Sequence, residues 1–342
     1  MAEHSGSGAS LLPEPPRPEP LRTEVKSHRV LLTGATGFIG RHVERQLLDA
    51  GHQVLAIVRP ERTSIPLDPR TSVIRASLLD PVGIGTALAQ ATAVIHLAGA
   101  VRGATAGEFS AVNVDGVRVM RDAILDTNPD LPVLLMSSLA ASFPELSEYS
   151  ASKRAGEDLL TADVRLRWTV IRPPAVYGPG DKELRLLLNL LRRGVIIIPG
   201  NPEQRLSFIH VTDLAAACVH WLTHHQILAH RVFSIDDGRA DGYDWPAIES
   251  EVCERHLLKV VIPPGLLRVL GRVNGWVADR LDQAPMFSPG KVRELMNPSW
   301  IARDTEGTQA FAAATGWHPA WQLGHGVRQT FESTSLMPHE RR

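Results

Sequence analysis

The stretch from Arg29 to Arg41 constrains the fold more than any other part of the chain. Residues 30–32, Val-Leu-Leu, form the short apolar run expected of a strand that is buried on both faces of a parallel sheet. Glycines follow at a spacing of three, at Gly34, Gly37 and Gly40, and a helical pattern begins there. Such glycines let the chain turn tightly and let its backbone approach a diphosphate, at which the helix points its N-terminal N–H groups. The stretch therefore predicts strand, phosphate loop and helix, and with them a dinucleotide site.

The composition excludes several classes of protein. A chain of 342 residues can bury a large core and can hold two lobes. Its formal net charge of −1 argues against nucleic acid or an anionic surface as the main partner, because such partners need a basic face. The two cysteines, Cys218 and Cys253, indicate free thiols in a reducing compartment, which predicts a cytoplasmic protein. No apolar run is long enough to span a membrane, and the acidic, Pro-rich N-terminus differs from a secretory signal.

The chain divides into parts that differ in composition and in hydrophobic pattern. Residues 1–28 are rich in Gly, Ser and Pro, which predicts a disordered or polyproline-like tail. From residue 29 to 180 strand patterns alternate with helical patterns, as is typical of a doubly wound parallel sheet, an α/β Rossmann fold. Residues 206–237 are predicted to return to this dinucleotide-binding domain. Residues 181–205 and 238–335 are predicted to form a smaller C-terminal substrate lobe over the carboxyl edge of the sheet.

Helical patterns continue into the predicted lobe. Helices are expected at Leu184–Arg193, Phe208–His220 and Leu323–Phe331. Apolar residues also recur at helical spacing, with arginines off the stripe, at Leu266, Leu270, Val273, Val277 and Leu281. This stripe indicates a helix packed on the core. The alternative is an apolar wall or membrane-surface contact that serves a lipidic substrate.

The residue after the second predicted strand bears on the choice of cofactor. NAD-specific folds usually place an acidic residue there, which accepts a hydrogen bond from the ribose 2′-hydroxyl. In this chain the position is Arg59, and Arg62 could add a second positive charge. Because Arg pairs strongly with phosphate, the sequence favours NADP as the cofactor, with NAD left open.

Three polar residues carry the predicted chemistry. Ser138 ends a buried strand, and Tyr149 and Lys153 stand four apart on one face of the next predicted helix. A cation beside a phenol stabilises the phenolate and lowers its pKa from about 10 toward the working range. The spacing therefore predicts Tyr149 as acid or base, Lys153 as the group that lowers its pKa, and Ser138 as the group that orients the substrate oxygen.

The histidines suggest no chemistry. His96 lies within a buried strand pattern and is interpreted as a core residue. The cluster His220, His224, His225 and His230 lacks a carboxylate or Cys at matching spacing, so a solvated helix end is favoured over a metal site.

Together these motifs resemble the extended short-chain dehydrogenases/reductases, also called the NAD-dependent epimerase/dehydratase family. The resemblance covers about residues 29 to 220 and rests, in family order, on Thr33-Gly-Ala-Thr-Gly-Phe-Ile-Gly40, His96-Leu-Ala-Gly99, Asn113-Val-Asp-Gly116, Ser137-Ser138, Tyr149-Ser-Ala-Ser-Lys153, Arg172-Pro-Pro-Ala-Val-Tyr-Gly-Pro-Gly180 and Phe208-Ile-His-Val-Thr-Asp213. It implies a Rossmann domain, a nicotinamide cofactor, and Ser138, Tyr149 and Lys153 as the catalytic triad.

The resemblance also implies which residues hold the cofactor. Asn113 helps to position it, and Pro173 and Pro174 lie beside the nicotinamide. The full predicted cofactor-binding set is Gly34, Thr36, Gly37, Phe38, Ile39, Gly40, Arg59, Leu97, Ala98, Gly99, Asn113, Tyr149, Lys153 and Pro173. No metal is expected in the site.

Departures from the family pattern narrow the reaction. The sugar-nucleotide epimerases of this family carry an Asn where this chain has Ala175 and an Arg where it has Leu206, although Arg205 is adjacent. Family dehydratases follow the catalytic hydroxyl with Asp-Glu, whereas Leu139 and Ala140 follow it here. The Arg after the second predicted strand, Arg59, together with the later Arg172-Pro-Pro, looks more like the dihydroflavonol-reductase and hydroxysteroid-dehydrogenase branch, which acts on ketones and secondary alcohols. The short connection between the catalytic Ser and Tyr also predicts a more open substrate site.

The sequence therefore predicts an NAD(P)-dependent oxidoreductase that transfers a hydride between the nicotinamide and a ketone or secondary alcohol. The expected substrate is a small, apolar molecule that is steroid-, flavonoid- or keto-lipid-like, for example a ceramide precursor. Two alternatives stay open: a sugar or nucleotide-sugar epimerase, and a non-catalytic NADP-binding structural or regulatory protein. A peripheral membrane contact and a homodimer are also left open.

Overall fold

The computed structural model describes residues 27–62, 66–103, 105–253, 258–281, 288–302 and 305–336. The predicted N-terminal tail, except for its last two residues, lies outside the described residues. The side chains of Arg62, Val277 and Leu281 also lie outside them. Within the described part, no helix combines the length and apolar character that crossing a membrane requires.

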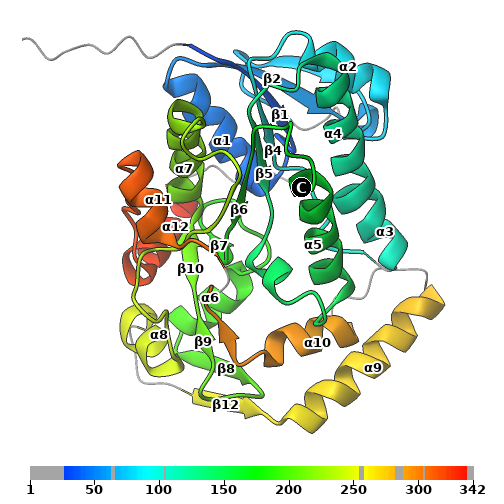
Figure 1. Ribbon diagram of the computed structural model, residues 1–342. Coiled ribbons are helices and arrows are strands. Elements are labelled where there is room, and N and C mark those ends of the chain that lie inside the picture. The colour runs from blue at the N-terminus through cyan, green and yellow to red at the C-terminus, as the bar shows by residue number, and fades with distance from the viewer. Residues whose placement is uncertain are drawn as a thin grey trace, which may run out of the picture.

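A sheet of seven parallel strands forms the centre of the molecule (Figure 1). The strands lie in the order β11-β6-β5-β4-β1-β2-β3, so the winding direction reverses between β1 and β4. Their bounds are β1 Arg29–Thr33, β2 Gln53–Val58, β3 Ser72–Arg75, β4 Ala93–His96, β5 Val133–Met136, β6 Trp168–Arg172 and β11 Arg231–Ser234. This order confirms the predicted doubly wound α/β fold.

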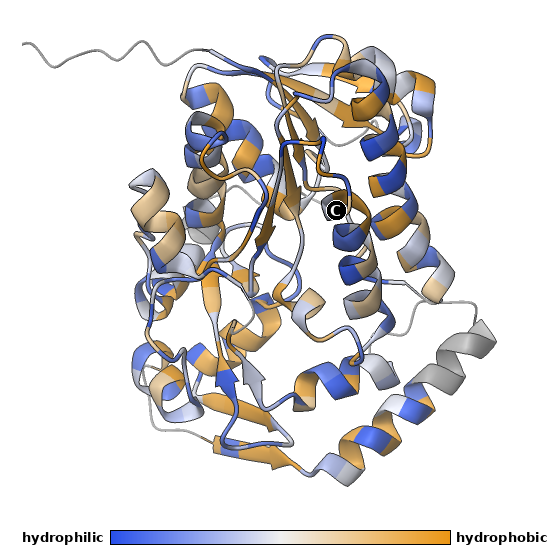
Figure 2. Ribbon diagram, viewed as in Figure 1, coloured by the Kyte–Doolittle hydropathy of each residue, from blue (hydrophilic) through white to orange (hydrophobic). Residues whose placement is uncertain are grey.

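Helices cover both faces of the sheet, which explains why its strands are apolar along their length (Figure 2). One face carries α1 (Phe38–Asp49), α7 (Val211–His224) and α11 (Thr308–Thr315), and the other carries α2 (Pro81–Leu88), α4 (Gly116–Thr127) and α5 (Glu148–Thr161). In β1, Leu32 packs in the first core with Leu47 of α1, and its neighbour Leu31 packs in the second with Ile124 of α4. Each such buried side chain contributes roughly 1.5–3 kcal/mol to stability.

The remaining elements form a smaller group beyond the carboxyl edge of the sheet (Figure 1). Three two-stranded sheets pair β7 (Ala175–Tyr177) with β10 (Phe208–His210), β8 (Val195–Pro199) with β12 (Leu258–Ile262), and β9 (Arg205–Leu206) with β13 (Ser299–Trp300). The helices are α6 (Arg185–Arg192), α8 (Trp245–Val252), α9 (Pro264–Leu281), α10 (Pro289–Met296) and α12 (Leu323–Leu336). A separate apolar core, which includes Tyr177, Tyr243 and Trp245, holds much of this group together. We call this group the lobe.

Helix α11 departs from its expected place in the lobe. Phe311 of α11 is fully buried in the core on the α1–α7 face of the sheet. Its ring meets the ring of Phe233 in β11 edge to face, with centroids 5.3 Å apart. The chain thus returns once more to the sheet after residue 238. The predicted boundaries of the two parts otherwise stay a prediction.

The predicted helix Phe208–His220 is wrong at its start. Residues 208–210 form β10, which pairs in parallel with β7. The His210 side chain then accepts a hydrogen bond from the Thr212 N–H and caps α7, which begins at Val211 and continues to His224. The motif Phe208–Asp213 therefore contains the strand β10 and the first residues of helix α7.

The leucines of α6 pack mostly inside the lobe. Leu188 and Leu191 are buried in the lobe core, and Leu184 and Leu187 pack against them. These side chains stabilise the lobe. In this helix only Leu186 exposes a large apolar side chain, of which 70% is accessible.

The interpretation of the 266–281 stripe as the core-facing side of a helix is also wrong for the described side chains. Leu266, Leu270 and Val273 are about half exposed, and α9 instead buries Leu267 and Gly271. A Cβ on Gly271 would lie 2.7 Å from the side chain of Val292 in α10. The helix therefore packs on α10 through the side that carries Gly271, and its more apolar face is left exposed.

Candidate active site

The loops predicted to form the site lie side by side at the carboxyl edge of the sheet. The Ala98 N–H, after β4, donates to the Thr33 hydroxyl at the end of β1 at 3.2 Å. The Leu139 N–H, after β5, donates to the carbonyl of Pro173, after β6, at 2.9 Å. These bonds fix the four loops in pairs where ligands of such sheets bind.

The glycine-rich loop after β1 leaves no room for a side chain at position 34 or 40. Gly34 has a φ of +73°, and a Cβ there would lie 2.8 Å from the backbone nitrogen of Ala98. A Cβ on Gly40 would lie 2.0 Å from the Gly34 carbonyl oxygen. The Gly37 N–H donates to the same oxygen at 2.9 Å and closes the turn. Only glycine at positions 34 and 40 allows this approach of strand, loop and helix.

The N-terminus of α1 fits a diphosphate. Gly37 caps the helix without a side-chain hydrogen bond, and the first turn holds no acidic residue. Its unsatisfied N–H groups and the positive end of its dipole therefore suit an anion. Thr36, Phe38 and Ile39 surround this end, where Ile39 packs on the core and Phe38 lies edge-on to the His42 ring.

Arg59 lies directly after β2, where the sequence places the 2′-phosphate contact. Its side chain is 49% exposed, and its Nη1 lies 3.9 Å from Oε1 of Glu61. An exposed ion pair at this distance contributes little, so the guanidinium is accessible to a phosphate. Glu61, which no sequence pattern singles out, would repel a second negative charge at this place.

Asn113 belongs to a π-helical turn, Ala111–Asp115, that the sequence did not predict. Its side-chain oxygen accepts from the Ala100 N–H at 2.9 Å, and its amide donates to the Ser152 hydroxyl, also at 2.9 Å. A Cβ on Gly156 would lie 2.2 Å from the Asn113 carbonyl oxygen, so this glycine lets α5 approach the turn. Asn113 thus ties the loop after β4 to the helix that carries Tyr149 and Lys153.

Tyr149 lies in the first turn of α5, and Ser138 lies just after β5. The Ser138 side chain is hydrogen-bonded to Tyr149. Burial raises the pKa of Tyr149 to about 12; the bond to Ser138 lowers it and the charge of Glu294 raises it further. The lowering by Lys153 that the spacing predicts is not among these effects, so Tyr149 is a neutral phenol that can donate a proton.

Lys153 lies one turn further along α5 and is 8% exposed. Its ammonium donates to the carbonyl of Met136, at the end of β5, at 2.9 Å. Burial lowers the pKa of Lys153 to about 8, although the Glu157 carboxylate raises it. The ammonium also lies close to Gly99, where a Cβ would be 3.6 Å away. The structure therefore brings Lys153, the loop after β4 and the strand before Ser138 together.

The lobe contributes Glu294, a residue that no local sequence pattern indicates. Ser147 caps α5, and its hydroxyl donates to Oε1 of Glu294 in α10. Glu294 is 6% exposed, and its other oxygen accepts from Lys291 at 2.9 Å. Phe143, in the short connection before Ser147, meets Trp300 edge to face at 5.4 Å. The lobe thus packs against the connection that was expected to leave the site more open.

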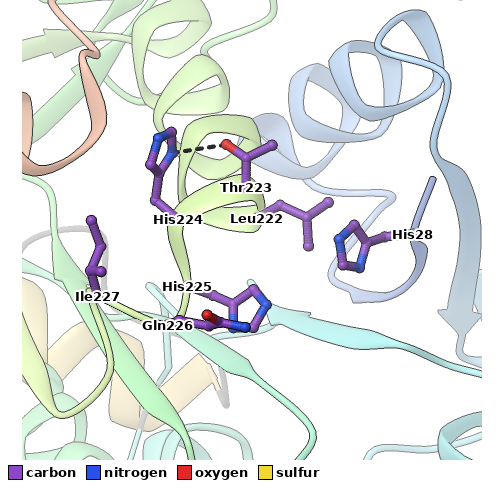
Figure 3. A pocket seen from close by; sticks show the side chains of 7 residues that line it. All are labelled: His28, Leu222, Thr223, His224, His225, Gln226 and Ile227. Carbon is purple, nitrogen blue, oxygen red and sulfur yellow. Dashed lines mark hydrogen bonds between the residues drawn. The ribbon is translucent and has the colours of Figure 1, made fainter. Parts of the chain in front are cut away.

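Three histidines at the other end of the sheet, His28, His224 and His225, help to line a pocket of about 310 Å³ (Figure 3). His224 and His225 belong to the histidine cluster of the sequence. His28 precedes β1 and His225 follows α7, so this pocket lies at the amino ends of the strands, away from Tyr149. His224 is hydrogen-bonded to Thr223 at 2.8 Å. Among the described residues, no three His, Cys, Asp or Glu side chains gather so that they could hold a metal ion. His96 is 1% exposed and hydrogen-bonds to Thr33, as a core histidine does.

Comparisons with known proteins agree with this geometry. Residues 30–235 match the family model of the NAD dependent epimerase/dehydratase family. The chain is 34% identical over 281 residues to a ceramide reductase of Caulobacter vibrioides, an alignment that covers 79% of this chain and 85% of that protein. It is 27% identical over 215 residues to the 2-alkyl-3-oxoalkanoate reductase of Stenotrophomonas maltophilia, with 55% and 63% of the two proteins covered. The solved UDP-glucose 4-epimerase of Thermotoga maritima has the same fold, with a TM-score of 0.64, 19% identity and coverage of 90% and 98%.

The chain therefore belongs to the NAD-dependent epimerase/dehydratase family. Within that family it is an NAD-dependent oxidoreductase of the extended short-chain dehydrogenase/reductase type, as its relatives named as reductases are.

Proposed function

We propose that this protein is an NADP-dependent reductase of an apolar ketone of the 3-keto lipid class, such as a ceramide precursor. The observation that carries the substrate class is the 34% identity to ceramide reductase over 79% of this chain. The neutral phenol of Tyr149, hydrogen-bonded to Ser138 at the carboxyl edge, supports the direction of reduction because it can donate a proton.

The residues of the site divide the chemistry between them. When bound, the nicotinamide supplies the hydride that reaches the carbonyl carbon. The Ser138 hydroxyl orients the carbonyl oxygen, and the Tyr149 hydroxyl donates its proton to that oxygen as the C=O π bond breaks. The product is a secondary alcohol. The Lys153 ammonium, one helical turn away, donates to the Met136 carbonyl and supplies positive charge beside the loop after β4, where the cofactor would bind. The phenolate left on Tyr149 is reprotonated from solvent.

The surroundings of Tyr149 favour an apolar substrate over a nucleotide sugar. The ring of Phe109, in the short helix α3 (Ala106–Ser110), lies 6.1 Å from the Tyr149 ring. Arg205, which is adjacent to the family's sugar-nucleotide position, pairs with Asp244 at 3.5 Å. A diphosphate buried without a cationic partner would be costly.

NADPH oxidation with ketones of graded size tests this proposal. We expect kcat/KM for 3-keto lipids to rise about fourfold for each methylene that the site buries, since each contributes roughly 0.8 kcal/mol. A steroid ketone and UDP-glucose serve as comparison substrates. Micromolar, saturable binding of UDP-glucose without a response to any keto lipid would favour the epimerase alternative. NADP binding without turnover of any substrate would favour the non-catalytic alternative.

The choice of cofactor is tested at Arg59. Arg59→Ala should weaken NADP binding about tenfold or more and barely change NAD binding, because a charge-assisted hydrogen bond contributes roughly 1.5–3 kcal/mol. Glu61→Gln is the matched variant, and it should strengthen NADP binding because it removes the negative charge beside Arg59. Calorimetry that shows the wild-type protein binding NAD more tightly than NADP would contradict the assignment.

The buried ammonium predicts how reduction depends on pH. Lys153 has a pKa lowered to about 8, so its charge is lost as the pH rises through that value, whereas an exposed lysine stays charged. We therefore expect kcat/KM to fall above about pH 8. Lys153→Arg, which stays charged, should show a lower rate without this decline. A wild-type rate that stays level up to about pH 10 would show that the charge of Lys153 is not needed.

A further inference from the structure

Exposed apolar side chains concentrate in one stretch of the lobe. Seven of the fourteen large apolar side chains that are exposed in the described part fall between residues 258 and 273. Strand β12 and helix α9, which follow each other at the end of the molecule opposite α2, carry them (Figures 1 and 2). The β12 members are Leu258, Val260 and Val261, and the α9 members are Leu266, Val269, Leu270 and Val273. We call these seven residues the apolar patch.

The α9 members of the apolar patch share one face of the helix. They follow the spacing i, i+3, i+4 and i+7, and each is between 45% and 54% exposed. The buried residues of α9, Leu267 and Gly271, lie on a different side of the helix, where Gly271 faces Val292 of α10. Helix α9 thus packs on the rest of the lobe through Leu267 and Gly271. Its apolar face stays about half exposed in the described part of the structure.

The charges beside the apolar patch are positive. Arg268 and Arg272 form a separate exposed line on α9, and neither has an ion pair among the described residues. Between residues 258 and 274, whose side chains the structure describes, the only other charged side chain is Lys259, which pairs with Glu249 of α8. Further along α9 the sequence continues with Asp279 and Arg280. An exposed helix whose residues 264–274 combine one apolar face with flanking arginines and no acidic residue is typical of a helix that lies in a membrane interface.

We propose that the apolar patch docks this protein on an anionic membrane surface, with α9 in the plane of the headgroups and Arg268 and Arg272 on the lipid phosphates. Docking would bring the active site to a keto lipid that is held in the membrane. This role of the docking rests on the proposed function. The docking itself does not, because it is measured on vesicles without substrate or cofactor.

Vesicle flotation of the full chain tests the docking. The wild-type protein should float with vesicles of phosphatidylcholine and phosphatidylglycerol, less so at high salt, and more weakly with phosphatidylcholine alone. Leu270→Asp should weaken binding at least tenfold, because it places a charge on the face that enters the interface. Arg268→Ser should weaken it about fivefold, the value of one basic residue near such a surface. Val82→Asp is the control, since Val82 is 79% exposed on α2 and should leave binding unchanged.

Other outcomes overturn the proposal. They are a wild-type protein that stays unbound to anionic vesicles, or a Leu270→Asp variant that binds as the wild type does. A dimer that Leu270→Asp converts to a monomer, without vesicle binding, would assign the apolar patch to a second copy of the chain.

Reduction of a short-chain, water-soluble ketone separates docking from catalysis. Leu270→Asp should keep that rate, and a loss of it would make the patch a substrate wall. Vesicle binding by a protein that reduces no ketone would support the docking and contradict the proposed function.

Discussion

Tyr149→Phe is expected to lower kcat/KM for reduction at least 100-fold while cofactor affinity and the folded structure stay unchanged. The substitution removes only the oxygen that the proposed function assigns as the proton donor, and a positioned acid contributes roughly 100-fold or more. Since the Phe ring keeps its place beside Phe109, packing in the first turn of α5 should persist. Steady-state kinetics and a cofactor titration on the same preparation measure both properties.

The chain offers a matched control for this variant. Tyr177 is fully buried in the lobe core, and its hydroxyl has no hydrogen-bond partner in the described part of the structure. Tyr177→Phe therefore removes the same atom without taking a proton donor from the site, and it should leave kcat/KM nearly unchanged. If Tyr149→Phe keeps more than about a tenth of the wild-type rate, another group must donate the proton.

Glu157→Ala is expected to destabilise the protein by about 3–5 kcal/mol, because it leaves the buried guanidinium of Arg172 without its carboxylate. The two side chains are 3% and 5% exposed, and Arg172 Nη2 lies 2.5 Å from Glu157 Oε2. Arg172 also donates to the Ser142 hydroxyl at 2.9 Å, so the pair joins α5, β6 and the turn after Ser138. Urea or thermal unfolding measures the loss.

The neighbouring residue separates burial from charge. Asp158 pairs with Arg154 on the exposed side of the same helix, at 2.8 Å, and its side chain is 61% exposed. Asp158→Ala should cost only roughly 0.3–0.5 kcal/mol, as is usual for exposed pairs four residues apart on a helix. Equal losses for the two variants would mean that the buried pair stabilises the fold no more than a surface pair does.

Short-range patterns in the sequence were sufficient for much of the fold and for the core of the candidate site. The strand, glycine loop and helix from Arg29 onward are local, and so is the four-residue spacing of Tyr149 and Lys153. Both depend only on strand and helix geometry and on where a Cβ cannot fit. The family resemblance then supplied Asn113, whose role in joining two segments no spacing could show. The roles assigned to these residues stay predictions, although the structure brings them to one edge of the sheet.

The tertiary structure alone decided which faces of these elements meet. Glu294 reaches Ser147 across 147 residues of sequence, and nothing in either local pattern indicates that contact. The apolar stripe of α9 was compatible with a buried helix, but Gly271 directs a different line of the helix onto α10. Helical spacing shows that one face of a helix is apolar. It does not show which segment packs against that face, because this depends on the packing of segments that are distant in the sequence. The sequence by itself therefore determined the class of fold, the phosphate loop and the catalytic spacing. Only the packed chain decided the pKa of Tyr149, the contact of the lobe with α5 and the exposure of the apolar patch.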